Sequence, residues 1–227
     1  MNPRFQSAAL AAGAGMAMLA AQPAQAQSAG SLMLRLGATR IAPQVKSGDL
    51  TAPAFAGTTA DIRADSALSG GITTMLTDNV SIDLPLALPY THDIVGDGAI
   101  AGVGKIGEVK SLPFTVFGQY RFLEAAAQLR PYLGLGVTYA RFYKARSTAA
   151  LSALTGGTPD KPTTLAIGSK FAPTVQAGLS FAINAQWFVD ANVSKTFLKT
   201  RTTLSSGQTL DATVDPNSFG LTVGYRF

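Results

Sequence analysis

The chain ends in FGLTVGYRF, residues 219–227, and this stretch decides the fold. Bulky apolar residues occupy every second position up to the last one, and small or polar residues separate them. A period of two places alternate side chains on opposite faces of a β-strand. An open sheet edge exposes unpaired N–H and C=O groups, so a strand of this kind is expected to be paired along its length. The ending therefore predicts a sheet that closes on itself, with the last strand paired to the first and Phe227 at the rim.

The same alternation occurs in seven further segments. In VSIDLPLALPYT, residues 80–91, one face is predicted to carry Val80, Ile82, Leu84, Leu86, Leu88 and Tyr90. The opposite face of these segments is rich in glycine, threonine, serine and alanine rather than in charge. The other candidate strands are SLMLRLGAT (31–39), ALSGGITTML (67–76), SLPFTVFGQYRF (111–122), LRPYLGLGVTYARFY (129–143), KFAPTVQAGLSFAI (170–183) and WFVDANVSKTF (187–197).

The connections between these eight segments alternate in length. Short ones fall at 77–79, 124–128 and 184–186, and long ones fall at about 41–66, 92–110, 144–169 and 203–215. This pattern is typical of an all-β, eight-stranded antiparallel transmembrane β-barrel with short periplasmic turns and long extracellular loops.

A soluble β-sandwich also alternates apolar and polar residues and is the alternative. The positions of the aromatic residues favour the barrel, because they gather at the strand ends as interfacial girdles do. The girdle near the short turns is predicted to contain Phe122, Phe181, Trp187, Tyr225 and Phe227, and the girdle near the long loops Tyr90, Tyr139, Tyr143 and Phe197.

The first 26 residues have the features of a cleaved signal peptide. Arg4 precedes the apolar run AALAAGAGMAMLAA, and Ala24-Gln25-Ala26 fits a small-x-small cleavage site. We expect residues 1–26 to be removed and residues 27–227 to form one barrel domain. The chain has no cysteine, and its net charge of +5 is spread without a basic run, so we expect no nucleic-acid partner.

Charged residues on the inward face gather near the short turns. Opposite charges confined in a narrow lumen should pair and fill it. We predict a periplasmic plug of ion-paired side chains, with Arg130 close by, made of Arg35, Asp83, Arg121, Asp190 and Arg226.

Smaller or apolar inward residues lie above this plug. An eight-stranded barrel is barely wider than its own side chains, so any path must be narrow. The candidate lumen lining is Thr115, Phe117, Gly134, Gly136, Phe142 and Leu198, and ordinary filling of the lumen is the alternative. The long loops are unusually apolar and are predicted to form a hydrophobic funnel or to pack together through Ile41, Val45, Phe55, Ala149, Leu151 and Leu154.

Three prolines mark a candidate lateral opening in the wall. Pro85 and Pro89 lie in the third predicted strand and Pro113 in the fourth, and proline cannot donate to the ladder. A molecule that enters the lumen and meets the plug would leave sideways there; the alternative is that these prolines only end strand pairing near the loops.

One histidine raises the alternative of a lipid-modifying enzyme. His92 precedes Asp93, and Ser111 and Thr91 are possible neighbours, but nothing in the sequence fixes their geometry. We expect no catalysis, no metal and no cofactor. Lys195 and Lys199 are placed to reach the outer interface, where lipopolysaccharide phosphates or solvent would meet them.

Four stretches together resemble the OmpW family of outer-membrane proteins: TDNVSIDLPLALPYTHDIVGDG (77–98), LPFTVFGQYRF (112–122), LRPYLGLGVTYARFY (129–143) and NSFGLTVGYRF (217–227). The resemblance implies an eight-stranded barrel in the bacterial outer membrane, associated with passage of small hydrophobic molecules, and a relative linked to alkane uptake. It also implies outer-membrane lipid, lipopolysaccharide and small apolar cargo as partners, and a terminal Phe227 that is read by the outer-membrane assembly machinery. A non-transporting barrel that acts through its loops is the second functional class left open.

Overall fold

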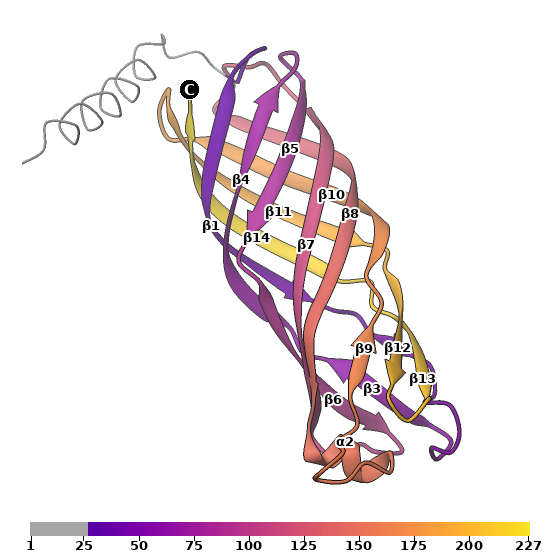
Figure 1. Ribbon diagram of the computed structural model, residues 1–227. Coiled ribbons are helices and arrows are strands. Elements are labelled where there is room, and N and C mark those ends of the chain that lie inside the picture. Colours follow the sequence, from indigo (N-terminus) through magenta and orange to yellow (C-terminus); the bar gives the residue numbers. More distant parts are fainter. Residues whose placement is uncertain (1–26) are drawn as a thin grey trace, which may run out of the picture.

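The computed structural model describes residues 27–227, and the expected signal peptide lies outside them. Eight antiparallel strands close into a barrel (Figure 1). In order around the wall they are β1 (Leu32–Ala42), β4 (Asp65–Met75), β5 (Val80–Ala87), β7 (Lys105–Arg121), β8 (Leu129–Ser147), β10 (Lys170–Ala182), β11 (Trp187–Thr196) and β14 (Asn217–Arg226).

The last strand closes the barrel on the first, as the alternating C-terminus predicted. The pairing of β14 with β1 runs from Met33 opposite Arg226 to Ala42 opposite Asn217. The amide of Phe227 then donates to the carbonyl of Leu32 at 2.8 Å, which fixes the final residue at the rim. The backbone groups along the β1–β14 pairing are thus placed to form hydrogen bonds, as a wall in lipid requires.

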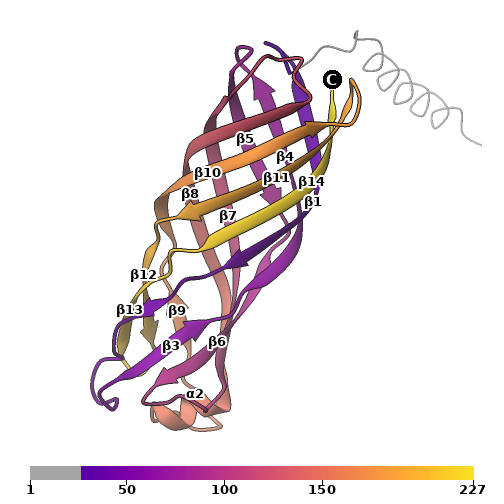
Figure 2. The same cartoon turned by 180° about the vertical axis from the view of Figure 1, so that it is seen from behind.

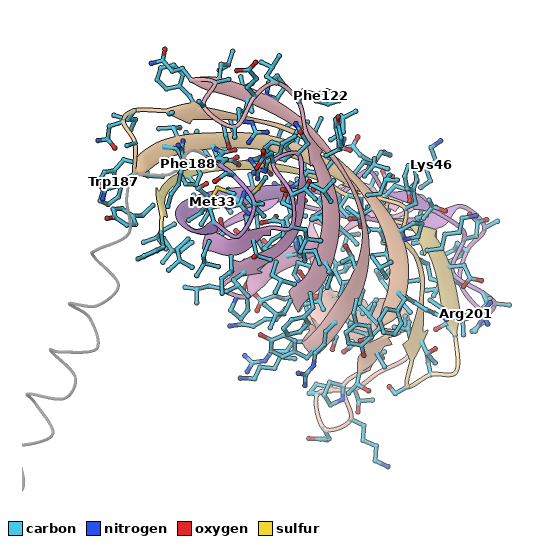
Figure 3. The ribbon with its side chains drawn as sticks, turned by 90° about the horizontal axis from the view of Figure 1, so that it is seen from above. Met33, Lys46, Phe122, Trp187, Phe188 and Arg201 are labelled. Carbon is cyan, nitrogen blue, oxygen red and sulfur yellow. The ribbon has the colours of Figure 1, made fainter. Side chains whose placement is uncertain are left out.

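The outer face of the wall is apolar and the inner face is mixed. On β8, Leu133, Leu135 and Val137 are exposed, whereas Tyr132 and Thr138 are buried inside. Viewed along the barrel, Trp187 points outward, while Phe188 and Met33 point inward (Figure 3). This is the reverse of a soluble barrel, whose apolar residues fill the interior.

The long connections contain strands and a helix that the sequence did not predict. β7 and β8 have 17 and 19 residues, well beyond the roughly 9–11 that a membrane span needs. Beyond the wall, β2, β13, β12 and β9 form a second sheet, and β3 and β6 extend the edge of β7 (Figure 2). These elements are β2 (Lys46–Ser47), β3 (Thr58–Ile62), β6 (Tyr90–Gly98), β9 (Leu165–Ile167), β12 (Lys199–Leu204), β13 (Thr209–Thr213) and the helix α2 (Ala149–Leu154). We call this assembly the cap.

The cap has an apolar core of its own. Buried residues from four different connections meet in it: Leu50, Ile100, Ile106, Leu151, Leu165 and Leu204. Of the apolar loop residues, Leu151 is therefore packed, whereas Phe55 is 80 % exposed. No helix in the part of the chain that the structure describes is long and apolar enough to cross a membrane.

Candidate functional site

A buried ion cluster fills the lumen near the short turns. The Arg35 guanidinium lies 2.6 Å from Asp83 and 3.2 Å from Asp190, and both carboxylates have no exposed surface. Thr73 donates to Asp83 at 2.5 Å, and the Tyr132 hydroxyl donates to Asp190 at 3.0 Å. Buried charges are tolerated when they are paired and hydrogen-bonded in this way.

The other two residues of the predicted plug lie in the same region without ion pairs among residues 27–227. Arg121 donates to Gln27, Ser81, Gln119 and Ser180, and its guanidinium lies 4.6 Å over the Tyr132 ring. Arg226 lies 5.1 Å over the ring of Phe188. Three of the five residues thus form ion pairs, Arg121 is held by polar and aromatic neighbours, and Arg226 contacts an aromatic ring.

Arg130 joins the turns below the plug. It donates to the backbone carbonyls of Gln27, Asp78, Phe122 and Leu123. Gln27, the first residue after the expected cleavage site, is 1 % exposed and accepts from Arg121 at 3.2 Å. Sequence reasoning missed Gln27, because its contacts join residues about a hundred positions apart.

A cavity of about 170 Å³ lies above the plug, inside the barrel. Of the candidate lining residues, Thr115, Phe117, Phe142 and Leu198 border it. Gly134 and Gly136 do not border it. A Cβ at Gly136 would lie 2.5 Å from the Phe117 ring, and one at Gly134 would lie 3.1 Å from Gln176, so neighbouring side chains already occupy the space that these glycines leave.

The lower part of the cavity is ringed by hydroxyl groups. Thr115, Thr138, Thr174 and Thr196, on four successive strands of the wall, form a hydrogen-bonded chain with oxygen–oxygen distances of 2.8, 2.6 and 3.0 Å. On the other side of the lumen, Thr39 and Ser69 are 2.8 Å apart. We call these six side chains the hydroxyl belt. The signal for it in the sequence is inward-facing threonine at matching heights, which the candidate lining included only at Thr115.

The upper part of the cavity is apolar. Its wall there, which we call the apolar collar, consists of Val45, Ile62, Ala140, Phe142, Leu198, Leu210, Ala212 and Val214. A second cavity of about 100 Å³ lies inside the cap, with Leu50, Phe55, Leu151 and Leu154 among its lining. Both cavities border Ala60, Ile94, Thr202 and Leu210, so they adjoin at these residues.

The wall between β5 and β7 is paired over only part of its height. The pairing runs from Val80 opposite Tyr120 to Asp83 opposite Phe117, and β6 next meets β7 at Tyr90 opposite Ser111. Residues 84–89 and 112–116 are left without pairing across this seam in the described chain. Pro85, Leu86, Ala87 and Pro113 border the cavity there, and Leu86 is also 53 % exposed on the outer face. We call this place the seam.

Two predictions about this region are corrected. The third strand ends at Ala87, and Pro89 lies in the short break before β6 without bordering the cavity. Tyr90 faces the lumen and is 1 % exposed, so it does not belong to the aromatic girdle. The alternation fails here because Leu88 and Pro89 separate β5 from β6. Even-numbered residues face lipid on β5, whereas the even-numbered Tyr90 on β6 faces the lumen.

His92 borders the cavity and does not pair with Asp93. Its Nδ1 is 2.9 Å from the carbonyl of Arg63 and its Nε2 is 3.2 Å from the Ser111 hydroxyl. Asp93 instead lies 2.6 Å from the Lys105 ammonium. The arrangement therefore lacks the carboxylate that orients histidine in a catalytic triad. Within residues 27–227 the structure has no group of three metal-ligating side chains.

The fold is similar to solved outer-membrane barrels. The crystal structure of OprG from Pseudomonas aeruginosa matches with a TM-score of 0.78 at 24 % identity, covering 88 % of this chain and 97 % of that chain. The solution structure of the Escherichia coli outer membrane protein W matches with a TM-score of 0.56 at 25 % identity, over 88 % of this chain and 99 % of that chain.

Sequence comparison gives the same kinship. Outer membrane protein W of Vibrio cholerae serotype O1 is 28 % identical over 218 residues, 93 % of this chain and 95 % of the relative. A dibenzothiophene metabolism operon protein, PahQ of Pseudomonas aeruginosa, is 25 % identical over 75 % of this chain and 76 % of its own length. The OmpW family model matches residues 28–227. The chain therefore belongs to the OmpW family, and it is a β-barrel of the bacterial outer membrane.

Proposed function

We propose that this barrel carries small hydrophobic molecules from the cell surface into the outer membrane, through the cap and the apolar collar and out at the seam. The observation that carries the proposal is the continuity of apolar lining from the cap cavity to the lumen cavity, with an interruption of the wall beside it. The relationship to a protein named for dibenzothiophene metabolism supports an apolar cargo.

The plug makes a straight path into the periplasm unfavourable. An apolar molecule moving downward would have to separate Arg35 from Asp83 and Asp190, which are fully buried. Breaking a buried ion pair costs several kcal/mol, roughly 3–5. A cargo that gains nothing in exchange stays above the plug, where the seam is the remaining side of the cavity that reaches lipid.

The composition of the seam supports its use as an exit. Unpaired backbone groups are costly at membrane depth unless they line a cavity. Pro85 and Pro113 have no N–H to leave unpaired, so they lower that cost on both sides. Leu86, which faces lipid and also borders the cavity, offers an apolar surface across the opening.

The absence of cysteine allows a direct test with single labels. Leu86→Cys would be reacted with a bulky thiosulfonate that a reductant removes, and Leu135→Cys, 74 % exposed on β8, is the matched control. In lipopolysaccharide-containing proteoliposomes, we expect the label at position 86 to slow transfer of an apolar fluorescent probe severalfold, and reduction to restore it. Equal transfer with both labels would refute the exit at the seam.

The same assay with unlabelled protein distinguishes passage from the second functional class, a non-transporting barrel that acts through its loops. If the unlabelled protein transfers the probe no faster than an unrelated eight-stranded barrel, passage is refuted and the cap becomes the working part of a surface-interaction protein. The proposal does not involve catalysis.

Outward-facing cations near the loop end are proposed to contact lipopolysaccharide phosphates. Arg141 lies 5.7 Å from the Tyr143 ring centroid, and Lys195 lies 6.0 Å from that of Phe197. Aromatic rings at the interface hold such cations at the level of the headgroups. Loss of lipopolysaccharide retention during purification of an Arg141→Gln/Lys195→Gln variant would support this contact, and unchanged retention would refute it.

A further inference from the structure

The lumen cavity has two chemically different halves. The apolar collar above suits a hydrocarbon, whereas the hydroxyl belt below presents oxygen atoms. Each hydroxyl has two acceptor positions and one donor, and the chain from Thr115 to Thr196 uses only three donors for its three internal bonds. Acceptor capacity therefore remains on the cavity side of the belt. A purely apolar cargo would leave it unused.

Two further polar atoms at the cavity floor have no hydrogen-bond partner in the described chain. They are the Nε of Arg35 and the hydroxyl of Thr222, and both side chains border the cavity. Arg35 is 8 % exposed and Thr222 is 6 % exposed. A buried polar group without a partner costs stability, so a ligand that supplies one gains binding energy. The Nε–H of Arg35 only donates, whereas the hydroxyl of Thr222 both donates and accepts.

Among the five plug residues Arg35 alone borders the cavity, since Asp83, Arg121, Asp190 and Arg226 do not line it, and its existing ion pairs leave little attraction for an anionic ligand. Arg35 is already held between two carboxylates, Asp83 and Asp190, neither of which is exposed. An incoming carboxylate would approach both of them, and like charges in a low-dielectric site repel strongly. A neutral head that both donates and accepts, such as a hydroxyl, avoids that repulsion.

We propose that the cavity selects amphiphiles with an apolar body and one neutral hydrogen-bonding head, of the class of alcohols and phenols. The head binds Thr222, Arg35 Nε and the hydroxyl belt, while the body lies in the apolar collar. The inference rests on the proposed function, since it names the cargo class for the same cavity, and it makes Thr222 a specificity-determining residue.

Competition binding tests the proposal with ligands of one chain length. The purified barrel in lipid nanodiscs is loaded with the apolar probe N-phenyl-1-naphthylamine, and octane, 1-octanol and octanoate at pH 8 are added as competitors at measured free concentrations. Thr222→Val is the main variant, because the hydroxyl that it removes makes no bond within the described protein. Thr138→Val is the second variant, and Thr203→Val, exposed on β12, is the matched control.

We expect 1-octanol to displace the probe best, after correction for its partition into lipid. Thr222→Val should weaken octanol about fivefold, the effect of about one hydrogen bond, and leave octane unchanged. Retained octanol preference in Thr222→Val and Thr138→Val would overturn the proposal, as would octanoate binding best. If all three ligands displace the probe equally while the barrel still transfers the probe in proteoliposomes, recognition of the hydroxyl head is overturned and the proposed passage stands. If the barrel does not transfer the probe in proteoliposomes, the proposed passage itself is refuted.

Discussion

Removing Arg35 tests whether the plug is held together by its charges. Arg35→Leu leaves Asp83 and Asp190 buried without their cation. The expected loss in the free energy of unfolding is about 3–5 kcal/mol, the usual effect of breaking a buried pair from one side. Reversible urea unfolding in phospholipid vesicles measures it. The exposed pair of Arg201 with Asp211 supplies the control, since Arg201→Leu should lower the free energy of unfolding far less than Arg35→Leu does.

The structure also predicts which second change restores stability. Asp190 keeps hydrogen bonds from Tyr132, Ser180 and Asn192 after Arg35 is removed, whereas Asp83 keeps only the one from Thr73 among the described residues. Asp83→Asn should therefore recover roughly 2 kcal/mol of the loss, more than the corresponding change at Asp190. A loss below about 1 kcal/mol for Arg35→Leu, or a better rescue through Asp190, would refute this description of the plug.

Three more predictions concern packing, assembly and titration. Gly178→Ala should lower the free energy of unfolding by about 1–3 kcal/mol, because its Cβ would lie 2.2 Å from an aromatic side chain, while Gly118→Ala, whose Cβ meets its nearest atom at 4.0 Å, should fold normally. Phe227→Ala should reduce the amount of folded barrel in the outer membrane of living cells, and an unchanged amount in a heat-modifiability gel would contradict the role proposed for the last residue. The pKa of the Asp211 carboxyl should lie below its ordinary range, because it accepts hydrogen bonds from Arg201. The stability that this contact adds is present above the ordinary carboxyl pKa and is lost as pH falls through the lowered pKa. In Arg201→Gln, NMR titration of Asp211 should show its titration midpoint move back up.

The barrel wall could be predicted from the sequence because its signal is local. Each strand carries its own period of two, and the alternation of Leu133, Leu135 and Val137 needs no knowledge of neighbouring strands. The cap could not be predicted in the same way, because its strands pair across distant connections. Ser47 meets Ala212, for example, and a two-residue strand has no period to read. The reversal at Tyr90 was missed because the break at Leu88 and Pro89 separates two strands that look continuous in sequence.

The sequence indicates which charged residues lie in the plug, but it does not indicate which of them contact each other. Parity alone places Arg35, Asp83 and Asp190 inside the barrel. Which of them meet depends on the stagger between strands, and that stagger is set by the closed sheet as a whole. The hydroxyl belt could not be predicted for the same reason. Thr115 and Thr196 come to similar heights only through the registers of three strand pairings, β7–β8, β8–β10 and β10–β11.

The cap joins segments from different connections into one folded unit, and this constrains how the cell surface of the protein can vary. β2 comes from the first long connection, β9 from the third, and β12 and β13 from the last, yet all four share one sheet. A loop of a typical barrel can be exchanged alone, whereas here a foreign sequence in the last connection would leave β2 and β9, which come from two other connections, unpaired. Antibodies or phages that bind this sheet therefore meet segments of several connections at once, and their epitopes on it are discontinuous.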